Sequence, residues 1–453
     1  MLTEKFTFPG GIHPPEGKSL AENQAIEILP TPKKLYLSVQ QHLGAPCAAT
    51  VNPKDAVEAD AVVATSDAFV SSPVHAPYAG VIGKAVKRTL PNGRHVPAVV
   101  LEVDSEKAPS GQQTLQQVYG GEWSIPADLD PAAIFPAVKS GGIVGMGGAA
   151  FPTHVKIAKN EKKPIDTILI NGSECEPYLT ADYRMMVEYP QPVVIGAILT
   201  AAAVGAKQVY FCIEDNKPEA IQSLEKAVSE SSNPFGINVS VRVMITKYPQ
   251  GGEKQLIRAV LNRKVPFPGL PMDVGALVEN VSTAAAVAGR VLRNKALTHR
   301  VVTVTGAGIA QPKNLFVPIG TPISELIEFC GGLKSTAQRV IMGGPMMGFS
   351  VGALDIPVTK GTSGITVLTA EEVKKSEETN CVRCGRCVGV CPMNLIPTKL
   401  ALGSRMQNTD VLQAYHVQAC IECGCCAYTC PASLPLVQLI RTGKIQIQKL
   451  AKK

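Results

Sequence analysis

Two cysteine runs decide the fold of the C-terminal part of this chain: Cys381-Val-Arg-Cys384-Gly-Arg-Cys387-Val-Gly-Val-Cys391-Pro392 and Cys420-Ile-Glu-Cys423-Gly-Cys-Cys426-Ala-Tyr-Thr-Cys430-Pro431. Both have the spacing C-x2-C-x2-C-x3-C-P, the bacterial run that holds a [4Fe–4S] cluster. In this pattern the first three thiolates bind one cluster, and the fourth, freed by the proline, binds the other. We therefore expect two crossed ligand sets, Cys381, Cys384, Cys387 and Cys430 in one, and Cys420, Cys423, Cys426 and Cys391 in the other.

Zinc sites and disulfides are the alternative uses of these cysteines. A zinc pair needs only two C-x2-C knuckles and would leave four thiols idle, and disulfides are rare in a reducing compartment. Cys425 lies next to a ligand but outside the spacing, so we expect it to bind no iron.

Length and composition indicate a soluble protein of three or four domains. The chain has 453 residues, is 45% hydrophobic and 18% charged, and is rich in Gly (40) and Pro (35), which suits α/β domains with many turns. The N-terminus has no apolar segment typical of a signal peptide. The longest apolar stretch, residues 193–206, is too short to span a bilayer and predicts a buried helix.

The positive charge is concentrated in the cysteine-rich part. From Cys381 onward, nine Lys and Arg stand against two acids, Asp410 and Glu422, and account for the formal net charge of +7. Thiolate-bound clusters are anionic, so these residues offset cluster charge. No stacking aromatics accompany them, so we expect no nucleic-acid binding.

Four domains are predicted along the chain: residues 1–115, 130–298, 299–350 and 370–453. The first is β-rich, with strands expected at 25–29, 34–37, 61–64, 80–86 and 96–103. Residues 72–83 are similar to the hairpin of a lipoyl or biotinyl carrier domain, but no lysine stands at the tip. His13 and His75 lie beside prolines and are interpreted as turn residues. Residues 106–130 are expected to form a loop.

The second domain alternates helices and strands, which predicts a mainly parallel sheet covered by helices. Strands are expected at 167–171, 208–213 and 239–245, and helices at 132–140, 192–205, 218–230, 252–261 and 274–292. A strand at 300–305 and a helix at 322–329 then suggest a small β-grasp-like domain. A charged linker at 371–378 precedes the cysteine-rich domain, which is expected to be helical.

A glycine-rich segment, Gly145-Met-Gly147-Gly148-Ala-Ala150, contains G-x-G-x-x-A. In a dinucleotide-binding unit such glycines follow a strand and open a helix, whereas here a helix precedes them and a strand follows. The segment is therefore interpreted as a glycine loop that lets a phosphate or flat ring approach the backbone, with Lys156 beyond it.

Two further segments carry polar groups to the same region. Asn171-Gly-Ser-Glu174-Cys-Glu176-Pro-Tyr178 follows a predicted strand, at the end where ligands gather in open α/β sheets. A polar turn that only caps the strand is an equal alternative for this segment. Residues 247–254 add a second glycine-rich nest at a helix start.

Taken in order, these segments resemble the flavin subunit of respiratory complex I. They are more similar still to the RnfC family, the C subunits of the Rnf complex, a ferredoxin:NAD oxidoreductase. The similarity to the RnfC family also includes Phe8-Pro-Gly-Gly-Ile-His-Pro-Pro-Glu-Gly17, Glu214-Asp-Asn-Lys-Pro and Ile341-Met-Gly-Gly-Pro-Met-Met-Gly. Three departures from the complex I pattern are Met146, Ser173 and Gly252.

The resemblance implies a barrel-sandwich-hybrid domain, an FMN/NAD-binding α/β domain, an SLBB-like β-grasp domain and a helical two-cluster ferredoxin-like domain. It implies non-covalent FMN and two [4Fe–4S] clusters as cofactors, and NAD(H) as substrate. Residues implied to face FMN are Gly145, Gly147, Lys156, Asn171, Glu174, Gly251 and Asn280. Residues implied to face the nicotinamide nucleotide, at the site of hydride transfer, are Phe151, Glu176 and Glu253.

A flavin connects the two kinds of carrier, because a nicotinamide exchanges two electrons as a hydride and a cluster accepts one. The expected function is that of an NADH/ferredoxin oxidoreductase subunit in an ion-translocating complex, with ferredoxin reached through a partner subunit. We expect it on the cytoplasmic face of the cell membrane. A soluble flavin/iron–sulfur reductase, similar to corrin reductases, and a non-enzymatic electron wire are the alternatives.

Overall fold

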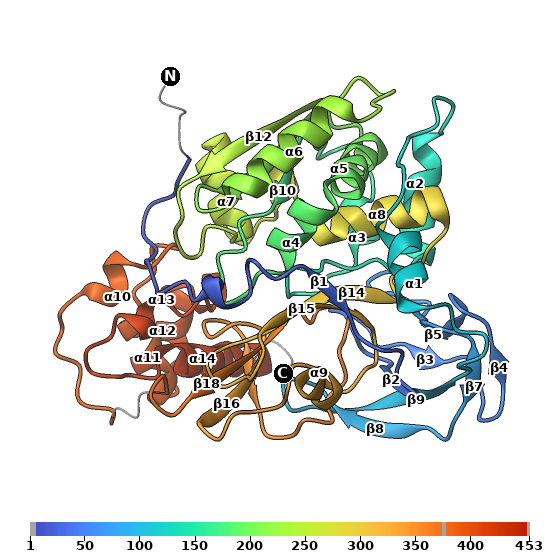
Figure 1. The fold of residues 1–453 in the computed structure, drawn as a ribbon. Helices are drawn as coiled ribbons and strands as arrows, with labels where there is room; N and C mark the ends of the chain where they lie inside the picture. Colours follow the sequence, from blue (N-terminus) through green and yellow to red (C-terminus); the bar gives the residue numbers. More distant parts are fainter. Residues whose placement is uncertain (1–5, 374–376, 451–453) are drawn as a thin grey trace.

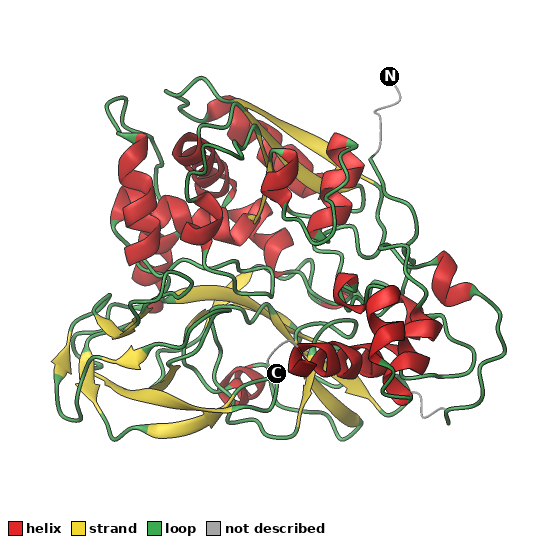
Figure 2. Cartoon of the chain, turned by 180° about the vertical axis from the view of Figure 1, so that it is seen from behind, coloured by secondary structure: helices red, strands yellow, loops and turns green. Residues whose placement is uncertain are grey.

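A computed structural model describes residues 6–373 and 377–450. The chain forms four parts in sequence order: β-rich, α/β, a second sheet, and a helical C-terminal part (Figure 1). The α/β part lies along one side of the molecule, and the two β-containing parts and the helical C-terminal part, red in Figure 1, lie along the other (Figures 1 and 2). This multidomain architecture confirms the predicted fold class.

The N-terminal β-rich part has two small sheets. The larger one has the order β2-β9-β7-β4, with β8 also paired to β9. Its strands are β2 (Lys34–Ser38), β4 (Ala56–Val57), β7 (Gly80–Ile82), β8 (Val86–Thr89) and β9 (His95–Val103). The smaller one joins β3 (Ala48–Ala49), β5 (Val62–Thr65) and β6 (Val74–His75). Inward-facing Leu35, Leu37, Val63 and Leu101 form the core between the sheets.

Two expectations for this region are wrong. The strand predicted at 25–29 is present as β1 (Ile26–Ile28), but it does not join the sheets of the β-rich part as expected. It pairs in parallel with β15 (Lys313–Pro318), in the sheet of the third part of the chain. The region expected to be a loop contains α1 (Gly111–Val118), which begins at a capping box between Ser110 and Gln113. The cap supplies partners for exposed amides, which allows a short polar helix to form.

A four-stranded parallel sheet forms the centre of the α/β part, in the order β12-β11-β10-β13. Its strands are β10 (Thr167–Asn171), β11 (Gln208–Glu214), β12 (Asn238–Met244) and β13 (Ala276–Asn280). The surrounding helices are α2 (Ile134–Ser140), α3 (Thr153–Ile157), α4 (Ala181–Glu188), α5 (Pro190–Val204), α6 (Pro218–Glu230), α7 (Glu253–Leu261) and α8 (Val281–Arg293). The chain leaves β10 toward β11 and β12 and later returns to its other side at β13. The boundary between β10 and β13 is therefore a topological switch point.

The predicted single helix over residues 274–292 is wrong, because this stretch divides into β13 and α8. Gly275, with φ of 71°, turns the chain into the strand. Asn280 then ends the strand and caps the helix, since its side chain accepts hydrogen bonds from the amides of Ser282 and Thr283. The free edge of β10 supplies the partner that makes residues 276–280 a strand.

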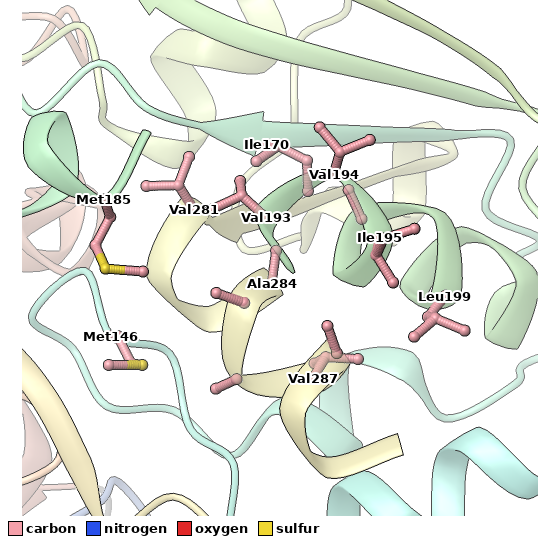
Figure 3. Close-up of a cluster of buried hydrophobic side chains, with 14 of the residues drawn as sticks. Met146, Ile170, Met185, Val193, Val194, Ile195, Leu199, Val281, Ala284 and Val287 are labelled. Atoms are coloured by element: carbon pink, nitrogen blue, oxygen red, sulfur yellow. The ribbon is translucent and has the colours of Figure 1, made fainter. Parts of the chain in front are cut away.

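Helices α5 and α8 pack closely in the largest core (Figure 3). Val193, Ile195 and Leu199 of α5 face Val281, Ala284 and Val287 of α8 in this core (Figure 3). The approach is close because α5 has a glycine at the contact: a Cβ at Gly196 would lie 1.7 Å from the carbonyl oxygen of Ala284. No single helix in the described ranges is long and apolar enough to cross a membrane; α4 and α5 together meet that test but join at a 97° bend.

The third part is a six-stranded sheet of order β1-β15-β14-β18-β16-β17, with α9 (Ile323–Phe329) packed on it. Its further strands are β14 (His299–Thr305), β16 (Ala337–Met342), β17 (Phe349–Val351) and β18 (Gly364–Thr369). β18 therefore extends this sheet beyond residue 350.

The C-terminal part is helical, and the same backbone turn occurs in both of its cysteine runs. Its helices are α10 (Arg386–Gly389), α11 (Pro397–Arg405), α12 (Thr409–Ala414), α13 (Cys425–Tyr428) and α14 (Leu436–Leu450). α10 and α13 each begin inside a cysteine run, directly after a left-handed glycine, Gly385 (φ 76°) or Gly424 (φ 85°). The two runs thus have matching backbone turns, as their shared spacing predicts.

Candidate functional site

The second cysteine run and the last cysteine of the first run meet around one hollow. It is lined by Cys391, Cys420, Cys423 and Cys426 and also by Cys425, which lies outside the spacing; its apolar walls include Leu395, Leu400, Val437 and Ile440. Cys391 is the one cysteine of the first run in this lining. This grouping agrees with the crossed set expected from the spacing, and ligation by that set stays a prediction.

Members of the other set also lie close together. The pKa of Cys387 is raised, first by burial and then by the neighbouring Cys384 and Cys430. Cys381 and Cys384 are exposed, whereas Cys387 is buried. In the described ranges no three His, Cys, Asp or Glu side chains are placed to hold a single metal ion. Of the five cysteines around the apolar hollow, the four that belong to the spacing fit a thiolate-bound cluster in number and kind.

The glycine loop lies at the switch point of the parallel sheet. Asn171 and Asn280, the last residues of β10 and β13, are partners in register. A Cβ at Gly147 would lie 3.5 Å from the Cβ of Asn280, whereas at Gly148 (φ 111°) it would meet no atom within 4 Å. The loop therefore passes directly over the strand ends and has an open side. Ligands of open α/β sheets bind at this position, and the uncovered backbone of the loop fits a phosphate or a flat ring.

A hydrogen-bond network holds the strand ends. Asn280 Nδ2 donates to Asp182 Oδ2 at 2.6 Å, and the other oxygen of Asp182 accepts from the hydroxyl of Ser282 at 2.7 Å. The carboxylate of Glu174 accepts from the amides of Asp182 and Tyr183 at the start of α4. Burial raises the pKa of Glu174 to about 7.

Lys18 supports this turn from the N-terminal segment. Its Nζ donates to the carbonyl oxygens of Glu174 and Glu176 at 2.8 and 3.1 Å, and also to Leu179. Lys18 and Asp182 were not among the predicted site residues, since neither belongs to a motif with a known spacing.

The second glycine-rich segment closes the other side of the switch point. Asn171 Nδ2 donates to the carbonyl oxygen of Gly251 at 2.8 Å, and the amide of Gly251 donates to Cys175 Sγ at 3.3 Å. Lys156 forms an ion pair with Glu253 at 2.8 Å and donates to the carbonyl oxygen of Val278 at 3.0 Å. The side chains of Lys156 and Glu253 are 32% and 37% exposed, so both remain accessible to a ligand.

The residues expected at the nucleotide have different surroundings. Phe151 is half-buried at the end of the glycine loop, and its carbonyl oxygen accepts from the amide of Gly145 at 2.8 Å. The carboxylate of Glu176 instead accepts from the amides of Met346 and Met347, at 2.6 and 3.0 Å. Burial raises the pKa of Glu176. The structure thus brings Phe151 and Glu253 to the glycine-rich loops and turns Glu176 toward the loop that follows β16.

One segment joins the two sites. The hydroxyl of Tyr248 donates to the carbonyl oxygen of Cys423 at 2.8 Å, and Gly251, which binds Asn171, lies in the same loop. On the other side of Tyr248, Ile12 exchanges backbone hydrogen bonds with it. The hollow around Cys423 is therefore fastened directly to the loop that closes the switch point.

Comparison with known domain families divides the chain in the same order as the structure. The matches are the RnfC barrel sandwich hybrid domain at residues 6–106, the Nuo51 FMN-binding domain at 138–289, the SLBB domain at 301–350 and the 4Fe-4S dicluster domain at 380–434. These matches confirm the expected cofactors, FMN and two [4Fe–4S] clusters.

Curated relatives cover most of the chain. The C subunit of the proton-translocating ferredoxin:NAD(+) oxidoreductase complex of Clostridium ljungdahlii is 42% identical over 403 residues, which are 87% of this chain and 84% of the relative. The C subunit of the Na(+)-translocating complex of Acetobacterium woodii is 41% identical over 441 residues, 97% of each chain. Among solved structures, the NAD+-reducing [NiFe]-hydrogenase in the H2-reduced state has a TM-score of 0.51 at 20% identity and covers 72% of this chain and 63% of its own, a likeness of fold.

The fold and the two sites define an electron-transfer protein that combines an FMN-binding α/β domain with a dicluster domain. Within that class, the chain belongs to the RnfC family, the C subunits of ion-translocating ferredoxin:NAD(+) oxidoreductase complexes. The resemblance identified from the sequence is confirmed.

Proposed function

We propose that this chain is the NAD-facing electron-transfer subunit of a membrane-associated ferredoxin:NAD oxidoreductase complex, in which electron transfer is coupled to ion translocation. One observation carries the proposal: the loop of Tyr248 and Gly251 bonds at one end to the cysteine-lined hollow and at the other to the switch point below the glycine loop. A direct contact between the two sites suits a protein in which a flavin and iron–sulfur clusters exchange electrons.

The bound flavin supplies the conversion between a two-electron hydride donor and one-electron clusters. The residues proposed to hold it are Gly145, Gly147, Lys156, Asn171, Glu174, Gly251 and Asn280. Asn171, Glu174 and Asn280 are already tied to backbone or carboxylate partners, so they orient the crevice before a ligand arrives.

Phe151, Glu176 and Glu253 are proposed to serve the nicotinamide nucleotide. Phe151 offers an aromatic face at the end of the glycine loop, and Glu253 offers a half-exposed carboxylate to ribose hydroxyls. Glu176 is committed to Met346 and Met347, so its proposed contribution depends on keeping that loop in place.

The two clusters would act in a defined order. The set with Cys423 adjoins the flavin part, whereas the other set has exposed ligands, Cys381 and Cys384. We therefore assign the exposed set to electron exchange with a partner subunit, through which ferredoxin is reached. Exposed Arg383 and Arg386 beside these cysteines suit an acidic partner.

We also propose domain boundaries and a location for this subunit. We propose residues 1–115, 130–298, 299–350 and 370–453 as the four domains, with β1 and β18 completing the third from outside its range. We place the subunit on the cytoplasmic face of the membrane, where NAD(H) and ferredoxin are available.

Crossed ligation is the sharpest test of the proposed electron path. Anaerobically prepared protein should contain about eight irons, as two four-iron clusters require. Cys391→Ala should change the same cluster signal, in electron paramagnetic resonance of the reduced protein, as Cys426→Ala. Cys430→Ala should instead match Cys387→Ala.

Cys425→Ser is the matched control, because Cys425 is buried beside the ligands but lies outside the spacing. It should retain the full iron content. Pairing of the Cys391 variant with the Cys387 variant would disprove the crossing. Stoichiometric zinc without acid-labile sulfide would refute the cluster assignment and the function built on it.

A further inference from the structure

Two buried cations lie behind the glycine loop, on elements outside the α/β part. Arg300 belongs to β14, and Lys360 lies in the segment between β17 and β18; each is 1% exposed. Within the described ranges neither side chain forms an ion pair within 4.0 Å. Burial lowers the pKa of Arg300, and the buried carboxylate of Asp182 raises it without a direct contact. Unpaired buried charges are rare because removal from water is costly.

Both cations bind backbone carbonyl oxygens at the root of the glycine loop. Arg300 donates to the carbonyl oxygen of Met146 at 3.2 Å and to that of Lys360. Lys360 Nζ donates to the carbonyl oxygens of Gly142 and Pro73, at 2.7 and 2.6 Å. Gly142 and Met146 flank the stretch that leads into Gly147.

These contacts decide which way the loop amides point. In a planar trans peptide the C=O and N–H groups point in opposite directions. Because the Met146 carbonyl points toward Arg300, the amide of Gly147 in the same peptide points away from it. That amide donates no hydrogen bond to any described residue, so it is available to a ligand on the open side.

We propose that Arg300 and Lys360 are positioning residues for the flavin: they hold the glycine loop from behind and provide the positive charge for an anionic group of the flavin nucleotide bound in front. This inference rests on the proposed function. It also explains why two cations without a direct ion-pair partner are buried at this place, since the bound anion adds to the compensation that Asp182 gives Arg300.

The charge state of Lys360 then depends on the ligand. Burial lowers the pKa of Lys360 to about 7. A nearby anion favours the charged form, so flavin binding should raise this pKa and be accompanied by proton uptake. The other titratable or charged groups around Lys360 are Cys47, His42, His75, Arg290 and Arg300. Burial lowers the pKa values of His42 and of His75, the latter to about 3, so the imidazole of His75 stays neutral.

The test uses the full chain, freed of flavin and titrated with FMN or riboflavin while flavin fluorescence is followed. Lys360→Met and Arg300→Met are compared with wild type and with Arg293→Met. Arg293 is a matched control, since it also binds carbonyl oxygens, at Gly120 and Glu122, but not those of the glycine loop. Iron content reports whether each variant is folded.

Wild-type FMN affinity should fall as pH rises through the titration of Lys360, because the neutral amine no longer attracts the anion. In Lys360→Met the Kd for FMN should be at least about tenfold higher near pH 6, and the two curves should converge near pH 9. Arg300→Met should weaken FMN binding throughout, with partial rescue in Arg300→Lys. The flavin midpoint potential should fall in both Met variants, which a purely structural role would not predict.

The two ligands identify the anionic group. A larger loss for FMN than for riboflavin supports the phosphate as the anionic group at the loop, whereas an equal loss would contradict an anionic group there, because the oxidised ring of riboflavin is uncharged. Lys360→Met with wild-type FMN affinity, pH profile and potential, and with clusters intact, would overturn the inference. Failure of the wild-type chain to bind FMN at all would instead refute the proposed function.

Discussion

At the scale of single residues, the two glycine-rich segments present Phe151, Lys156 and Glu253 to one crevice. The Lys156–Glu253 ion pair, at 2.8 Å, is partly exposed and holds the start of α7 against the end of β13 through the carbonyl oxygen of Val278. Because both charged groups already have partners, a ligand would meet a fixed arrangement of side chains, which lowers the ordering cost of binding.

The aromatic ring of Phe151 is expected to contribute to nucleotide binding but not to flavin binding. Phe151→Ala should reduce kcat/KM for NADH about tenfold or more, because about 1.4 kcal/mol of lost stacking corresponds to a factor of ten. Flavin content and cluster spectra should stay unchanged. The measurement is NADH-dependent reduction of an artificial acceptor by the purified subunit, beside flavin release on acid treatment.

The same assay is applied to the variants Glu253→Gln and Glu176→Gln. Glu253→Gln should raise KM for NADH more than it lowers kcat, since the carboxylate is proposed to bind ribose and not to move a proton. Wild-type kinetics in the Phe151 and Glu253 variants, with flavin retained, would place the nucleotide elsewhere.

At the scale of elements, the contact between α5 and α8 determines where the crevice lies, because α8 begins at Asn280. Gly196 allows the two helices to approach, as a Cβ there would lie 1.7 Å from the carbonyl oxygen of Ala284. Backbone atoms cannot move aside as a flexible side chain can, so a methyl group at this position must separate the helices.

Gly196→Ala should therefore lower the free energy of unfolding by about 1–3 kcal/mol or more, as overpacking in a core does. It should also reduce FMN occupancy, since α8 carries Asn280. Gly289→Ala, in the facing helix, is the control: its Cβ would meet only Val118 O at 3.7 Å, so stability should be unchanged or slightly higher. Thermal unfolding and the flavin-to-iron ratio measure both effects; equal behaviour of the two variants would contradict the packing argument.

At the scale of the whole molecule, the N-terminal segment connects the flavin and cluster parts. The amide of Gly11 donates to the carbonyl oxygen of Val390 in the first cysteine run, and Ile12 pairs with Tyr248 of the α/β part. The cluster hollow and the switch point are thus held together by contacts distant in sequence, which favours a constant distance between their cofactors.

Membrane attachment should depend on contacts with other subunits. High salt, chaotrope or alkaline washing of membranes should release the protein, as followed by immunoblotting, whereas lipid-embedded subunits should stay behind. The basic, partly amphipathic α14 offers a direct route to anionic lipid instead. Tight binding of the isolated protein to protein-free anionic vesicles, or retention until detergent is added, would favour that route.

The sequence alone determined those features whose cause is local. Cysteine spacing predicted that Cys391 would lie with Cys420, Cys423 and Cys426, as it does around the hollow, because the proline directs the fourth cysteine away from its own run. The crossed ligation itself stays a prediction. Residues 167–171 and 218–230 were predicted with the bounds of β10 and α6, since hydrophobic runs and an initial proline act within the element itself. The glycine loop, Asn171 and Gly251 were likewise recognisable from their residue types.

Tertiary structure decided what depends on partners remote in the chain. Residues 276–280 became a strand because β10 offered a free edge, and β1 joined β15 some 290 residues away. Glu176 is committed to the Met346 and Met347 amides, a direction that no local pattern encodes. Arg300 and Lys360 reached the glycine loop from other parts of the chain, and neither carries a motif. Their role follows from burial, because a charge withdrawn from water must find its compensation in three dimensions.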